Sequence, residues 1–169
     1  MPFGEYYPLK WLLSPLFDYL KIPMSDLTPG LYGQALLQAR GLEIAPFVCY
    51  EIAYPQQVLA QAREAQLLIT LSDDSWFGES IAAAQHLEIA QMRALETQRY
   101  LLFSTNSGFS AVINPEGKLI AELPMNKTGI LHAQIRAVKG STPLMRWGYA
   151  PLGLLVMLLL FVGLFQRRR

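Results

Sequence analysis

Cysteine is nearly absent from this sequence. The chain contains one, Cys49, which excludes an internal disulfide and any zinc site built from several thiolates. Histidine is almost as rare, and His86 and His132 are too far apart in the sequence to suggest a pair of metal ligands. The sequence therefore predicts no metal site, and Cys49 is the only thiol available for chemistry.

Strong net charge and an export signal are also missing. The net charge is +1 and no basic stripe interleaved with aromatic residues occurs, so general binding to nucleic acid is not expected. Residues 1–9 contain Glu5 and two prolines instead of the apolar core of a signal peptide. A serine triad is possible in principle, but the chain has no Gly-x-Ser-x-Gly motif to carry its nucleophile.

One long apolar segment lies near the carboxyl end. Residues 147–165 carry no charge and are long enough to cross a bilayer core of about 30 Å as a helix that rises about 1.5 Å per residue. Trp147 and Tyr149 suit the lipid–water interface at one end, and three arginines, 167–169, close the other. A buried core helix is the alternative, but core helices of this length normally carry a polar face. We predict a transmembrane helix with a basic tail over residues 147–169.

Hydrophobic patterns upstream of that segment predict an α/β domain. Strands over 35–39 and 42–49 are joined by Arg40-Gly41, where the glycine allows the positive φ of a hairpin turn. Pro55 opens a helix, and the apolar run 67–71 follows it as a buried strand. Parallel strands need such a helical crossover, so a layered α/β fold is expected.

The remaining elements follow in regular succession. A long amphipathic helix is expected over 81–98, with Ser80 as its N-cap. His86, Arg93 and Glu96 are expected on the solvated or pairing face of this helix, not in catalysis. The domain spans 1–135, and 136–146 link it to the apolar segment. Its last strands are expected over 101–105, 109–113, 119–123 and 129–135.

The motif Pro46-Phe47-Val48-Cys49-Tyr50-Glu51 supplies the first candidate site. An apolar strand delivers Cys49 to its carboxyl end, where the strand fixes a thiol and the following loop leaves it accessible to a substrate. The alternative is an inert buried cysteine, a common residue of apolar strands. Glu51 shares the side of Cys49 only if the strand continues, and it could equally cap the helix that begins near Pro55.

Two further segments supply candidate site residues. The loop Ser72-Asp73-Asp74-Ser75-Trp76-Phe77-Gly78 follows the next parallel strand, so Trp76 and Phe77 are candidate walls of a pocket on the same sheet edge as Cys49. Glu5 lies in a Gly-Pro loop between aromatic residues, a setting that holds a carboxylate rigidly. Simple surface solvation is the alternative for Glu5.

Five motifs together resemble the carboxyl-terminal part of the apolipoprotein N-acyltransferases, a bacterial inner-membrane family of the nitrilase (carbon–nitrogen hydrolase) superfamily. They occur in the family's order with similar separations, and the closing apolar segment resembles the family's last transmembrane span. The matching segments are Pro2-Phe3-Gly4-Glu5-Tyr6, Phe47-Val48-Cys49-Tyr50-Glu51, Ser72-Asp73-Asp74-Ser75-Trp76-Phe77-Gly78, Gln85-His86 with Met92-Arg93-Ala94-Leu95-Glu96, and Thr105-Asn106-Ser107-Gly108.

The resemblance implies a two-step acyl transfer. A cysteine matching Cys49 takes an acyl chain from a phospholipid, typically phosphatidylethanolamine, as a thioester. The amino group of a lipoprotein's diacylglyceryl-cysteine then accepts that chain. Glu5 resembles the family's supporting glutamate, and Tyr50 and Glu51 resemble residues that flank the nucleophile. The implied partners are a phospholipid acyl donor, an apolipoprotein acceptor and the membrane, and neither a metal nor a cofactor is implied.

The resemblance also implies parts that this sequence lacks. The superfamily uses a Glu, Lys and Cys triad, and the lysine and the general-base glutamate are both expected upstream of Met1. The strands and helices amount to about half of a four-layer α-β-β-α sandwich, which would leave a sheet edge and an apolar face uncovered. We therefore predict a partial nitrilase-like sandwich in a fragment that is inactive alone, with the amino-terminal half as a further expected partner. A misread start codon, a split gene and a gene remnant remain alternatives.

Location and function class follow from the same resemblance. The family implies the bacterial inner membrane, with the catalytic domain periplasmic in the complete protein. Arginines 167–169 suit a cytoplasmic tail, but Arg136, Lys139 and Arg146 oppose them on the other flank, so the charge rule does not orient the lone helix. Two alternatives stay open: a membrane-tethered amidase or nitrilase that acts on a soluble carbon–nitrogen substrate, and a non-catalytic remnant.

Overall fold

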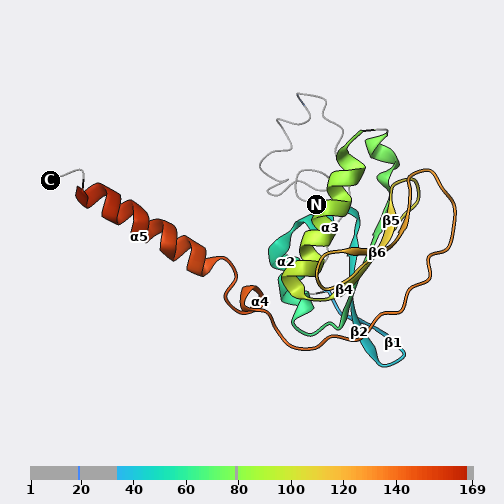
Figure 1. Cartoon of the computed structure of the whole chain (residues 1–169), viewed down its shortest axis with the longest axis horizontal. Coiled ribbons are helices and arrows are strands. Elements are labelled where there is room, and N and C mark those ends of the chain that lie inside the picture. The colour runs from blue at the N-terminus through green and yellow to red at the C-terminus, as the bar shows by residue number, and fades with distance from the viewer. Residues whose placement is uncertain (1–18, 20–33, 79, 167–169) are drawn as a thin grey trace. The chain divides into compact units, whose positions relative to one another are not determined.

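The computed structural model describes residue 19, residues 34–78 and residues 80–166. Contacts divide the chain into two units, Met1–Gln34 and Ala35–Arg169, and Glu5 with its loop lies outside the described residues. The second unit contains a six-stranded sheet in which sequence order and spatial order agree (Figure 1). Its strands are β1 (Leu37–Ala39), β2 (Leu42–Val48), β3 (Leu67–Ser72), β4 (Tyr100–Thr105), β5 (Ser110–Ile113) and β6 (Leu119–Leu123).

The predicted hairpin is confirmed by the antiparallel pair β1 and β2. Arg40 and Gly41 both take positive φ, +50° and +77°. This combination is the backbone of a two-residue turn whose twist matches that of the flanking strands. Because β2 ends at Val48, one residue earlier than expected, Cys49 is the first residue beyond the strand.

Two helical crossovers make β2, β3 and β4 parallel, and the pairing of β2 with β3 confirms the predicted strand–helix–strand unit. Helix α2 (Pro55–Ala62) begins at proline, which lacks the N–H that a first helical turn leaves unpaired. Helix α3 (Ala82–Thr97) starts one residue later than expected, and the Ser80 hydroxyl accepts from the Ala82 N–H at 3.3 Å. The carboxyl ends of three neighbouring strands therefore meet at one edge of the sheet.

The last predicted strand is wrong. Strands β5 and β6 pair antiparallel beside β4, but the described residues 124–142 contain no strand after them. Residues 129–135 alternate apolar and polar side chains, yet Ile130 is 82% exposed. Alternation stabilises a strand only where a neighbour pairs its backbone and a core covers one face, and this segment has neither.

The core lies between one face of the sheet and the helices α2 and α3, which cover that same face (Figure 1). Phe47 and Phe103 fill its centre and are each 2% exposed. The other face carries a row of apolar side chains from β2 to β5 that lie opposite one another in register. The apolar side chains nearest the loops after β2 and β3 are exposed. One helix layer and one sheet layer correspond to half of the predicted four-layer sandwich. The row consists of Pro46, Ile69, Leu102 and Val112, with Val48 and Leu71 exposed beyond it.

A short helix, α4 (Pro143–Trp147), interrupts the expected linker and packs into the core through Met145, which is 0% exposed. The Thr142 hydroxyl donates to the Glu96 carbonyl at 2.8 Å, and Arg63 Nε donates to the Met145 carbonyl at 2.8 Å. These contacts attach α4 to the ends of α3 and α2.

The apolar segment forms helix α5 (Ala150–Gln166), which begins at Ala150 because Gly148, at φ +57°, ends α4 first (Figure 1). None of the helices in the described ranges is both long enough and apolar enough to cross a membrane.

Two of the polar residues expected on the solvated or pairing face of α3 form a pair. Arg93 donates to Glu96 at 3.0 Å, and their side chains are only 9% and 13% exposed. Burial raises the pKa of the Glu96 carboxyl, while Arg93 and the Tyr149 hydroxyl partly offset this effect. His86 is different, because it is 1% exposed and faces the edge of the sheet where Cys49 lies.

Candidate functional site

Cys49 lies in the turn that follows β2. It is the first residue of a 3-10 helix, Cys49–Ala53, and its backbone has φ +52°. Positive φ is unusual outside glycine and costs roughly 1–2 kcal/mol, so neighbouring contacts must hold the turn. The cysteine is a free thiol of intermediate exposure, which gives it the accessible strand-end position that the sequence predicts.

Glu51 holds the turn from its upstream side. Its carboxylate accepts a hydrogen bond from the Val48 N–H at 2.7 Å. Because the strand ends at Val48, Glu51 does not extend the strand face of Cys49, and it caps the 3-10 turn instead of helix α2. The two interpretations drawn from the sequence are thus replaced by a third, in which Glu51 fixes the residue before the thiol.

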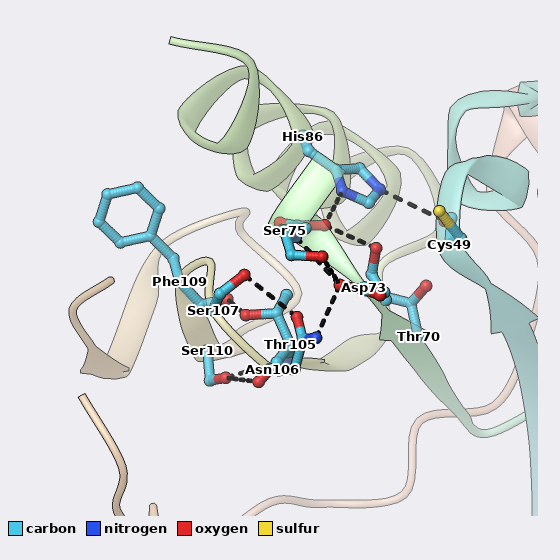
Figure 2. A network of polar contacts seen from close by, with 12 residues as sticks. Cys49, Thr70, Asp73, Ser75, His86, Thr105, Asn106, Ser107, Phe109 and Ser110 are labelled. Atoms are coloured by element: carbon cyan, nitrogen blue, oxygen red, sulfur yellow. Dashed lines mark hydrogen bonds and ion pairs between the residues drawn. The ribbon is translucent and has the colours of Figure 1, made fainter. Parts of the chain in front are cut away.

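His86 holds the turn from its downstream side. Its Nε2 lies 3.3 Å from the Cys49 carbonyl oxygen, and its Nδ1 lies 3.1 Å from Asp74 Oδ1. Figure 2 shows the ring bridging from α3 toward Cys49 on one side and the loop after β3 on the other. The Ser72 hydroxyl also donates to Asp74 Oδ1, at 2.6 Å. Asp74 stands in the loop that was predicted as a wall of the pocket, whereas His86 was not predicted to belong to the site, although it stands in one of the motifs that carry the resemblance.

Aromatic rings surround the His86 imidazole. Phe103 and Phe77 meet it edge to face with ring centroids 5.1 and 6.0 Å away, and Tyr50 tilts against it at 6.0 Å. Phe77 and Tyr50 therefore contact the site by packing against the His86 ring. Trp76 does not line a closed pocket, because its side chain is 86% exposed.

A second polar network ties the loops after β3 and β4 together (Figure 2). Asp73 Oδ1 accepts from the Ser75 N–H at 3.0 Å and from Asn106 Nδ2 at 2.6 Å. Hydrogen bonds from the Ser75 side chain and backbone, and from Asn106, lower the pKa of the Asp73 carboxyl. The described residues contain no cluster of three or more His, Cys, Asp or Glu side chains that could hold a metal ion. The site thus consists of a thiol on a turn held by hydrogen bonds, next to two loops that hydrogen bonds join to each other.

Gly108 provides a test of how firmly Asp74 is held. A methyl group at Gly108 would lie 2.4 Å from Asp74 Oδ2, and that carboxylate is 1% exposed and bonded to His86. We expect Gly108→Ala to lower the free energy of unfolding by about 1–3 kcal/mol, measured by chemical denaturation. Gly129→Ala is the matched control, because its methyl would meet only the end of the Leu123 side chain, at 3.0 Å. Equal losses in the two variants would contradict this interpretation.

The chain resembles known proteins in both its sequence and its fold. The carbon-nitrogen hydrolase family model matches residues 6–142. The chain is 49% identical over 97% of its length to the apolipoprotein N-acyltransferase of Coxiella burnetii, and 44% identical over 99% to that of Pseudomonas paraeruginosa. It spans about a third of the length of these relatives, 34% and 33%. Among solved structures, Saccharomyces cerevisiae Nit3, a member of the nitrilase superfamily, matches with a TM-score of 0.53 at 22% identity, over 60% of this chain and 40% of Nit3.

Proposed function

Because this chain belongs to the carbon–nitrogen hydrolase family, we propose that it is the carboxyl-terminal part of a lipoprotein N-acyltransferase in which Cys49 is the nucleophile. The observation that carries the proposal is the left-handed turn at Cys49, which presents the only thiol of the chain at the edge where three parallel strands end. The relatives named apolipoprotein N-acyltransferase align over nearly the whole chain and support this choice.

The proposed chemistry has two balanced steps. The Cys49 thiolate attacks the carbonyl carbon of a phospholipid ester, and the leaving alkoxide takes a proton to give a lysophospholipid and a thioester. The terminal amine of an apolipoprotein's diacylglyceryl-cysteine then attacks the thioester, so that an amide forms and the thiol is released. The supporting carboxylate is assigned to Glu5. A general-base glutamate and a lysine, which the resemblance to the nitrilase superfamily implies for the longer protein, would move the protons.

Exposed apolar side chains around the site favour a lipid donor over a soluble amide. Val48 and Leu71, at the ends of β2 and β3, are 57% and 58% exposed. Trp76 and Ile81, on the segment between β3 and α3, are 86% and 72% exposed. An acyl chain could cover such residues, whereas a small polar substrate would leave them in water. This surface supports the acyltransferase over the membrane-tethered amidase or nitrilase, which is the second candidate.

We assign the full-length protein to the bacterial inner membrane, with the catalytic domain in the periplasm and α5 in contact with lipid. Helix α5 has 17 residues, so it is about 25 Å long. Its large side chains from Leu152 to Leu164 are 43–72% exposed, on every side of the helix. Apolar surface of this extent is stable only when lipid or protein covers it.

Vesicle flotation tests the assignment of α5. We expect the chain to float with phospholipid vesicles and a variant that ends at Gly148 to remain in the dense fraction. Loss of flotation after a wash with high salt would instead indicate attachment through charge. Equal flotation of the two chains would contradict a role for α5 in binding lipid.

The rest of the longer protein is a further proposed partner. In the apolar row on the second face of the sheet, Pro46, Ile69 and Leu102 are half-buried, and an additional layer from the rest of the longer protein would complete their burial. This arrangement would bring the general base and lysine to Cys49.

Intact mass spectrometry tests the proposed function directly. The full-length protein that contains these 169 residues is incubated with a phospholipid of defined acyl chain. The expected result is one fatty-acyl adduct on Cys49, which a diacylglyceryl-cysteine peptide discharges by becoming acylated. Discharge by water alone, with hydrolysis of small amides, would favour the amidase or nitrilase. Absence of both reactions would favour the non-catalytic remnant.

A further inference from the structure

We propose that His86, oriented by Asp74, is a positioning residue for Cys49: it fixes the left-handed turn by donating a hydrogen bond to the Cys49 carbonyl. The inference rests on the proposed function only in taking Cys49 as the nucleophile. It concerns a residue of α3 that is 37 positions away in the sequence and carries no part of the thiol chemistry itself.

The atoms beside the two ring nitrogens indicate how the His86 ring is oriented. Nε2 lies 3.3 Å from the Cys49 carbonyl oxygen, which can only accept, so the proposed bond has Nε2–H as its donor. Nδ1 lies 3.1 Å from Asp74 Oδ1, so the Asp74 carboxyl group orients the ring with its other nitrogen toward Cys49.

The surroundings leave the His86 ring one orientation. Phe103 and Phe77 meet its plane edge to face, and the ring is 1% exposed. Asp74 is fixed in turn by the Ser72 hydroxyl and by Gly108, whose missing side chain makes room for the carboxylate. Because the ring cannot reorient, its hydrogen bond fixes the position of the Cys49 carbonyl.

The turn at Cys49 needs such a contact. With φ at +52°, Cys49 occupies a backbone state that a non-glycine residue leaves unless it is held. Glu51 accepts a hydrogen bond from the N–H of Val48, the residue before Cys49, and His86 binds the carbonyl of Cys49 itself. If the carbonyl contact is lost, the turn relaxes toward negative φ and the thiol moves. A displacement of about 1 Å at a reacting atom costs on the order of 100-fold in rate.

Three variants separate positioning from simple stability. His86→Phe keeps an aromatic ring but removes both nitrogens, and His86→Gln keeps an N–H that can reach the Cys49 carbonyl. Asp74→Asn keeps the shape of the side chain but removes its charge. Ile113→Val is the stability control, because it trims a core side chain of β5 that is 0% exposed, at about 0.5–1.5 kcal/mol.

Two rates are measured for each variant. The first is alkylation of Cys49 by iodoacetamide in the 169-residue chain, followed by intact mass, where a single cysteine makes the signal specific. The second is acyl-adduct formation by the full-length protein at varied phospholipid concentration. We expect His86→Phe to lower the maximal rate of adduct formation by about 10- to 100-fold with little change in the apparent KM, and to slow alkylation by about threefold or more.

The conservative variants decide the outcome. His86→Gln should recover most of both rates, and Asp74→Asn should fall between His86→Phe and the wild type. If His86→Phe matches Ile113→Val in both rates, or if His86→Gln is as slow as His86→Phe, the positioning role is overturned. If the wild type forms no adduct while alkylation follows the expected order, the acyltransferase proposal fails and the positioning of Cys49 by His86 stands.

Discussion

Cys49→Ser is expected to abolish acyl-adduct formation in the full-length protein, with a rate loss on the order of 10⁴-fold or more. A thiol forms an appreciable fraction of its nucleophilic anion near neutral pH, whereas a serine hydroxyl needs a strong adjacent base that evolved for it. A hydroxyl would also form an ordinary ester, which an amine attacks less readily than a thioester. The measurement is the initial rate of adduct formation, followed by intact mass.

The variant should otherwise resemble the wild type. The Cys49 side chain is only half-buried and serine has nearly the same shape, so we expect the free energy of unfolding to change by less than about 1 kcal/mol. Cys49→Ala should be equally inactive. Adduct formation by either variant at the wild-type rate would mean that another side chain is the nucleophile.

Arg99→Met is expected to lower the free energy of unfolding by about 3–5 kcal/mol, a larger loss than the one expected for Gly108→Ala. The guanidinium is 2% exposed, and burial lowers the pKa of Arg99 below its usual value. Its hydrogen-bond partners are backbone carbonyls at the ends of α2 and α3 and in two connecting segments. Methionine would fill the space but leave these oxygens without donors. The accepting carbonyls belong to Ala62, Ala65, Thr97, Gln98 and Gly140.

Arg99→Lys is the matched control for charge. An ammonium group keeps the charge but presents three donors from one atom, so it cannot reach carbonyls spread around a planar fork. We therefore expect Arg99→Lys to recover less than half of the loss, measured by urea denaturation in detergent. A loss below about 1 kcal/mol for Arg99→Met would contradict the argument, because it would mean that water replaces the guanidinium without cost.

Local patterns predicted those parts of the fold that local forces determine. The turn at Arg40-Gly41, the helix start at Pro55 and the parallel strands β2 and β3 all follow from backbone preferences and hydrophobic periodicity. The position of Cys49 at the carboxyl end of a strand followed from the same patterns, although the strand stops one residue earlier than predicted. The strand expected at 129–135 failed because its pattern gives no information on whether a partner strand is adjacent.

The contacts that hold the turn at Cys49 could not be predicted in this way, because they join residues that are distant in the sequence or depend on where a strand ends. Helical periodicity alone does not say whether His86 points to solvent or to a neighbouring loop, and its partner Asp74 lies 12 residues earlier. The motif containing Gln85-His86 was the available signal. Glu51 shows a similar limit, since its bond to the Val48 N–H depends on where the strand stops.

The segment that leads into α4 is held at the edge of the sheet opposite to Cys49. Arg99 and Gln66, at the amino ends of β4 and β3, hold the chain at Gly140 and Val138, whereas Cys49 lies beyond the opposite ends of the strands. Six-residue strands separate the two ends by about 20 Å. The chain therefore leaves for α5 about one strand length away from the thiol.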